Sequence, residues 1–161
     1  MLMGGSLDDT VERLARLVGV ATGDMSDEHA RWAIYLKGME LPAARELLLR
    51  AVDAESDDNL AASVVLRMIE RIGEAERAEW VNSLRGDKRT YAHRRALELT
   101  ILERILSGTL ESAEVVQQID GWTDWLQLRI AESATSPEVL EIVGEAGRNR
   151  RIRKTAKDRR A

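Results

Sequence analysis

The sequence predicts an all-α protein, and three observations support this. Apolar residues recur at spacings of three and four along most of the chain, which is the period of a helix that buries one face. No segment alternates between apolar and polar residues over the length of a strand. The 161 residues include no Phe and only two Pro. We therefore expect stacked antiparallel helix pairs or an irregular helical bundle.

The first half of the chain predicts four helices. Ser6 precedes an apolar stripe and is expected to cap the first helix. Ser26 is expected to cap the second helix, which should stop near Gly38. Pro42 stands where the first turn of a third helix tolerates proline. Residues 56–72 are apolar over a wide arc, which predicts a central and well-buried helix.

Shorter helices are predicted in the second half of the chain. Ser136 is expected to be an N-cap and Pro137 the first helical residue, ahead of a buried stripe of Val139, Leu140 and Val143. The expected helices of this half cover residues 74–84, 91–106, 112–119, 123–133, 137–145 and 150–159.

Two internal similarities indicate repeated helical units. The sequence LRMIERI at 66–72 recurs as LTILERI at 99–105, and each copy precedes a break and a shorter apolar helix. RIAESA at 129–134 is echoed by RIRKTA at 151–156, which follows SPEVLEIVGEAG at 136–147.

The stretch from about residue 126 to residue 161 resembles the HEAT and leucine-rich-variant class of α-helical repeats. Units of that class often read Pro-Glu-Val-Leu and are followed by an Arg-x-Arg-x-x-Ala helix start. The resemblance implies antiparallel helix pairs with a groove or edge used for binding, mostly of proteins or peptides and in a minority of nucleic acid. It implies no function by itself.

Length and composition favour one soluble domain. A chain of 161 residues buries enough surface to be stable as a single domain over 1–161 without disulfides or metals. Apolar residues make up 44% and charged residues 32% of the chain, which is typical of a globular protein. The sequence has no Cys, no cationic and apolar leader, and no run of eighteen apolar residues. These features predict a cytoplasmic protein that does not contact a membrane.

The basic C-terminal segment, residues 148–161, is the strongest charge feature. It carries eight Arg or Lys and one acid, a local charge of +7 on a chain whose net charge is −4. Such a segment is expected to attract phosphate, an anionic surface or acidic protein groups. Its candidate partner-binding residues are Arg148, Arg150, Arg151, Arg153, Lys154, Lys157, Arg159 and Arg160.

A second basic cluster lies at residues 85–95, and two tryptophans form another candidate contact. The cluster consists of Arg85, Lys88, Arg89, Arg94 and Arg95, whose simpler role is pairing with Glu on adjacent helices.

Trp122 and Trp125 are candidate partner anchors, because Trp is favoured at interfaces. Filling of the core is the alternative for Trp122, and it is the role expected of Trp32 and Trp80.

Residue types that carry chemistry are sparse. The two histidines, His29 and His93, stand in no metal-binding motif, and no glycine-rich phosphate loop occurs. We therefore expect no enzymatic activity, no metal and no cofactor. The expected function is a helical-repeat interaction module that binds a protein or peptide. The alternative is a nucleic-acid-binding protein that uses the basic C-terminal segment and the 85–95 cluster.

Overall fold

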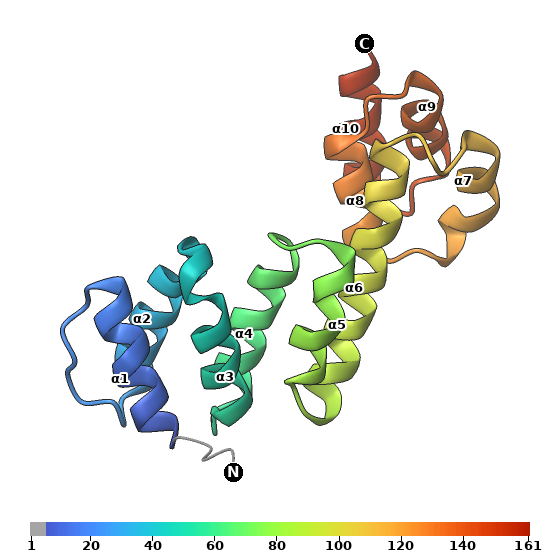
Figure 1. Ribbon diagram of the computed structural model, residues 1–161. Helices are drawn as coiled ribbons and strands as arrows, with labels where there is room; N and C mark the ends of the chain where they lie inside the picture. The colour runs from blue at the N-terminus through green and yellow to red at the C-terminus, as the bar shows by residue number, and fades with distance from the viewer. Residues whose placement is uncertain (1–5) are drawn as a thin grey trace. The chain divides into compact units, whose positions relative to one another are not determined.

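The computed structural model describes residues 6–161, and over this range the protein is all-α. About 78% of the chain is helical and no strand occurs in residues 6–161, which confirms the predicted fold class. The elements in chain order are α1 (Leu7–Val18), α2 (Glu28–Glu40), η1 (Pro42–Ala44), α3 (Arg45–Ala54), α4 (Asp58–Ile69), α5 (Glu74–Asn82), α6 (Gly86–Leu106), α7 (Ser112–Gln118), η2 (Ile119–Gly121), α8 (Asp124–Ser133), α9 (Pro137–Ala146) and α10 (Arg150–Arg160) (Figure 1).

The chain divides into two compact units. Unit 1 is Met1–Ala96 and unit 2 is Leu97–Ala161, so that the division falls within helix α6. The prediction of one domain over residues 1–161 stays a prediction, and its first five residues lie outside the described range.

Local sequence sets most helix starts. The hydroxyl of Ser6 accepts a hydrogen bond from the backbone N–H of Asp9, and that of Ser136 accepts one from Val139, so both predicted N-caps are confirmed. The prediction that Ser26 caps the second helix is wrong. Asp27 is the cap, because its carboxylate accepts the His29 N–H at 3.0 Å while Ser26 binds the preceding Asp24.

The core of unit 1 is formed by the inner faces of α1 to α5. Helix α1 packs against α2 and α3, and α4 packs against α2, α3 and α5. Trp80 is buried on α5, as the sequence predicts. The largest buried apolar side chains of α1 to α4 are Leu14, Ile34, Tyr35, Leu48, Met68 and Ile69.

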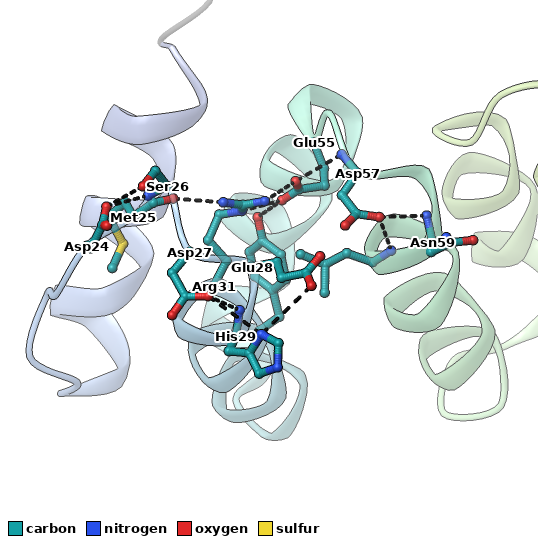
Figure 2. A network of polar contacts seen from close by, with 12 residues as sticks. Asp24, Met25, Ser26, Asp27, Glu28, His29, Arg31, Glu55, Asp57 and Asn59 are labelled. Carbon is teal, nitrogen blue, oxygen red and sulfur yellow. Dashed lines mark hydrogen bonds and ion pairs between the residues drawn. The ribbon is translucent and has the colours of Figure 1, made fainter.

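A buried ion pair crosses the core of unit 1 (Figure 2). Arg31 on α2 donates to both carboxylate oxygens of Glu55, at 3.0 and 2.9 Å, and its third nitrogen donates to the carbonyl of Met25. The phenol of Tyr35 donates to Glu55 at 2.6 Å, and the backbone N–H of Asp57 donates to the same carboxylate at 3.2 Å. Glu55 is 2% exposed, and each of its two carboxylate oxygens accepts two hydrogen bonds, one from Arg31 and one from Tyr35 or Asp57.

Unit 2 packs α7 to α10 on one continuous apolar core. Helix α10 packs closely against α9 and α8, and α9 also contacts α7. The buried residues of this core include Leu102, Ile105, Val115, Ile119, Leu126, Ile130, Leu140, Val143, Ile152 and Ala156. The two similar heptads differ in secondary structure, since α4 ends at Ile69 whereas α6 continues to Leu106.

A buried glutamine joins three segments of unit 2. The side chain of Gln127, 1% exposed, donates to the carbonyls of Ile119 and Trp122 and accepts the backbone N–H of Arg148 at 2.8 Å. Both N–H donors and the oxygen of the amide are thereby bonded at one junction, which ties together η2, α8 and the turn before α10.

We expect Glu55→Gln to lower the free energy of unfolding by about 3–5 kcal/mol, because the buried guanidinium of Arg31 would lose its carboxylate. Tyr35→Phe, which removes one donor to Glu55, should cost about 1–3 kcal/mol. Glu46→Gln is the control, since Glu46 forms an exposed pair with Arg50 worth about 0–1 kcal/mol. Urea unfolding followed by circular dichroism measures all three, and a loss below about 1 kcal/mol for Glu55→Gln would contradict the assignment.

Gly147 separates α9 from α10 at a point where no side chain fits. A Cβ atom at Gly147 would lie 2.6 Å from the carbonyl oxygen of Val143 and 2.8 Å from Ile152 Cγ2. We expect Gly147→Ala to destabilise the protein by about 1–3 kcal/mol through overpacking. Gly121→Ala is the matched control, because a Cβ there meets no atom within 4 Å. Thermal unfolding of both variants tests this, and equal melting temperatures would refute it.

Candidate functional site

Two hollows lie side by side over helix α4 in unit 1. The first, of about 340 Å³, lies between α2 and α4, and the second, of about 400 Å³, lies between α4 and the first turns of α6. Asn59 and Ser63 of α4 line both hollows. We call the two hollows together the α4 groove.

Each hollow has one aromatic side chain in its wall. Trp32 lines the first hollow and carries the guanidinium of Arg67 over its ring at 5.1 Å from the centroid. Tyr91 lines the second hollow, is 50% exposed, and has Arg95 at 5.5 Å from its ring centroid. Stacked cations hold these rings in place while leaving apolar ring surface at the groove.

Two polar residues of α4, Asn59 and Ser63, line both hollows of the groove. The hydroxyl of Ser63 donates to the backbone carbonyl of Asn59 at 2.9 Å. The side-chain amide of Asn59 is exposed and makes no hydrogen bond to any residue between 6 and 161. An amide side chain carries two donors and an acceptor, which match the carbonyl and N–H of one peptide group.

The first hollow has an acidic end (Figure 2). Asp57 caps α4 by accepting the N–H groups of Asn59 and Leu60, both at 3.0 Å, and lies beside Glu28 of α2. A hydrogen bond between the two carboxyl groups raises the pKa of Glu28 and lowers the pKa of Asp57. The His29 ring, 3.5 Å from Asp27 and 3.8 Å from Glu28, adds the only basic group in this hollow's described lining.

The buried Glu55 positions this acidic end. Its carboxylate holds the N–H of Asp57 at the start of α4 and, through Arg31, the helix that carries Glu28. The geometry of the groove therefore depends on the core contact of unit 1 and not on a mobile loop.

The predicted tryptophan anchors lie elsewhere, in unit 2, and one of them needs correction. Trp122 is 6% exposed and belongs to the core, so it is not an exposed anchor for a partner. Trp125 is partly buried against the same core, and Arg129 lies over its ring at 5.3 Å. Trp32, expected in the core, is instead only partly buried and lines the groove.

Three arginines of the basic C-terminal segment bind helix-end carbonyls. Arg148 donates to the carbonyls of Asp120 and Trp122 and pairs with Asp124 at 2.8 Å. Arg153 donates to Gly147, after α9, and Arg159 donates to Ala131 and Ala134, at the end of α8. These contacts give the three residues a structural role, because the last carbonyls of a helix have no partner inside it.

The other five cations of the segment are more exposed. Lys154 pairs with Asp158 at 2.7 Å, and Arg160 with Glu141 at 3.4 Å. Arg150, Arg151 and Lys157 are exposed and form no ion pair with any residue in the described range.

The 85–95 cluster is dispersed over different contacts of unit 1. Arg85 donates to the carbonyl of Asp53, and Arg89 donates to those of Leu84 and Asn82, so both bind helix-end carbonyls instead of glutamates. Arg95 donates to the hydroxyl of Tyr91 at 3.0 Å. Lys88 lines the second hollow, and Arg94 is exposed.

Sequence reasoning did not find the α4 groove. Asp57 caps α4, and this local role gives no sign of a groove beside the helix. Only the packing of α2 and α6 beside α4 brings Glu28 and Tyr91 to the same surface as Asn59.

Residues 6–161 contain no group of three or more His, Cys, Asp or Glu side chains placed to hold a metal ion. Within the same range, none of the helices combines the length and the apolar character needed to cross a membrane.

Comparison of the chain with models of protein families, with characterised proteins and with solved structures gives no match in any of the three.

Structural and free cations of the basic C-terminal segment should differ in their effect on stability. We expect Arg148→Met to lower the free energy of unfolding by about 1–3 kcal/mol, because the carbonyls of Asp120 and Trp122 lose their donor. Arg150→Met is the matched control and should change it by less than about 0.5 kcal/mol. Denaturant titration of the two variants measures the difference, and similar values would mean that the carbonyl contacts of Arg148 contribute nothing.

Proposed function

We propose that this protein is a non-enzymatic helical interaction module that binds an extended peptide segment of a partner protein in the α4 groove. The observation that carries the proposal is that the two hollows share two lining residues, Asn59 and Ser63, and have an aromatic ring in each wall. A peptide in an extended conformation advances about 3.3 Å per residue, so a short segment of several residues would occupy both hollows.

The partly buried aromatic rings and the free amide suit a peptide better than a small metabolite. Trp32 and Tyr91 offer apolar surface for alternate side chains, and the amide of Asn59 is free to pair with a peptide group between them. Both hollows are open to solvent over much of their surface, whereas sites for small molecules enclose most of the ligand.

Charge complementarity favours a peptide with a Lys or Arg side chain in the first hollow. A hydrogen bond to Asp57 raises the pKa of Glu28 and lowers that of Asp57, and two adjacent carboxylates repel each other when both are ionised. An ammonium or guanidinium group would relieve this repulsion and would lie next to the ring of Trp32.

The test is selection from an array of immobilised random ten-residue peptides, followed by affinity measurement by fluorescence anisotropy. We expect the selected peptides to contain a Lys or Arg. Asn59→Ala, and the double variant Glu28→Gln with Asp57→Asn, should each weaken binding by about tenfold or more. Asn is as good an N-cap as Asp, so the start of α4 is preserved in the double variant.

The matched control is Glu79→Gln with Asn82→Ala, in a separate hollow between α3 and α5, and it should bind like the unchanged protein. Selection of no peptide, or of peptides whose affinity is unchanged in both groove variants, would overturn the proposal.

The affinity of a selected basic peptide should rise with pH. The pKa of Glu28 is raised by the hydrogen bond to Asp57, so below that pKa a proton occupies the place of the cation. Affinity should therefore be low in acid, increase as pH passes upward through the raised pKa of Glu28, and level off at neutral pH. In the Glu28→Gln and Asp57→Asn variant this pH dependence should disappear. Binding that strengthens on acidification would contradict the assignment.

A further inference from the structure

A row of cations on α10 faces away from the core of unit 2. The inner face of the helix carries Ile152 and Ala156, both buried. Counting at 100° per residue from the midpoint of Ile152 and Ala156, the outward face holds the acid Asp158 and four cations, Arg150, Arg151, Lys154 and Lys157. We call these four residues the α10 basic stripe.

The free protein already holds the stripe in place. Arg153 and Arg159 donate to carbonyls of Gly147, Ala131 and Ala134, and α10 packs on both α8 and α9. Within the described residues Lys154 has an acidic partner, Asp158, and the other three stripe residues form no ion pair. A partner of opposite charge would therefore meet a rigid helix and would displace no structural bond except that exposed pair.

Neither a bilayer nor a nucleic acid fits the stripe as well as a protein does. The apolar residues of α10 are used in the core, which leaves its outward face without the apolar surface that an interfacial membrane helix inserts. From Arg150 to Lys157 the stripe extends only about 10 Å, so that it can neutralise about three phosphates.

We infer that the α10 basic stripe is a docking surface for an acidic helix of a partner protein. Arg150, Lys154 and Lys157 are spaced by four and three residues, which matches carboxylates at the same spacing on a second helix. This surface is separate from the α4 groove and does not depend on the function proposed for it.

The test uses a fluorescein-labelled helical peptide of about twenty residues, with Glu at spacings of four and three on one face of an alanine-rich background. We expect this peptide to bind the intact protein. Replacing all four stripe residues by Gln should weaken binding at least tenfold. Gln is a good helix former, so α10 should persist, which circular dichroism and thermal unfolding check.

Three further variants test whether binding depends on the stripe itself and not on net charge, on folding or on the α4 groove. Changing Arg13, Arg16, Lys37 and Arg94 to Gln, all exposed and outside unit 2, removes the same charge and should alter affinity by less than about twofold. The milder Arg150→Gln with Arg151→Gln, at two positions without ion pairs, should weaken binding severalfold with no change in melting temperature. The variant Glu28→Gln with Asp57→Asn should bind the acidic peptide like the unchanged protein.

The competing ligands are a 20-base-pair DNA duplex, a 20-nucleotide RNA and vesicles with anionic lipid. Tighter binding of DNA or RNA than of the peptide, through the stripe and with a log-log salt slope near about −3, would overturn the inference in favour of nucleic acid. Stripe-dependent binding to the vesicles in preference to the peptide would overturn it in favour of a membrane surface. Absence of peptide binding, or an equal loss in the two variants that replace four cations, would also overturn it.

Discussion

Helices of nine to thirteen residues leave many backbone carbonyls without an internal partner, and in this protein arginine side chains from other segments bind them. The last four carbonyls of each helix lack a donor inside the helix, so a fold of many short helices has this problem repeatedly. A guanidinium group suits the task because its five N–H groups can reach two carbonyls at once while the aliphatic stem packs on the core. The arginines that donate to carbonyls at or just beyond helix ends are Arg71, Arg77, Arg85, Arg89, Arg148, Arg153 and Arg159.

Because some arginines bind helix-end carbonyls, the positive charges seen in the sequence are not all available to a partner. Arg77 is 3% exposed and donates to the carbonyl of Ile69, although nothing in its local sequence distinguishes it from a surface arginine. Within the basic C-terminal segment the same division separates Arg148, Arg153 and Arg159 from the α10 basic stripe. A dense run of cations therefore contains two populations, and only the outward-facing one is available to a partner.

The buried pair of Arg31 and Glu55 connects the core of unit 1 with the α4 groove. A buried ion pair is weak evidence for stability on its own, since dehydration of two charges offsets much of their attraction. In this protein the pair fixes the positions of neighbouring groups, because Glu55 also accepts hydrogen bonds from the phenol of Tyr35 and the N–H of Asp57. The acidic end of the groove thus has a rigid support, as a surface that recognises a ligand by charge and shape requires.

The sequence alone determined the helices, because their signals are local. Serine caps, an apolar period near 3.6 and the positions of Gly and Pro act within one or two turns, and they predicted nearly every element, including a start at Pro137. Two helices were exceptions at their starts. Asp27 and not Ser26 caps α2, and α6 begins at Gly86, five residues before the predicted start at 91.

Only the tertiary structure decided which surfaces are open. Trp122 lies in a core while Trp32 lines a groove, the reverse of what the sequence favours for Trp32, because burial depends on which helices pack around each residue. The α4 groove combines residues from positions 28 to 91, and no local pattern links them. The sequence also could not show which cations are free to bind a partner. Arg159, for example, is held by carbonyls of Ala131 and Ala134, which lie 28 and 25 residues away in the chain.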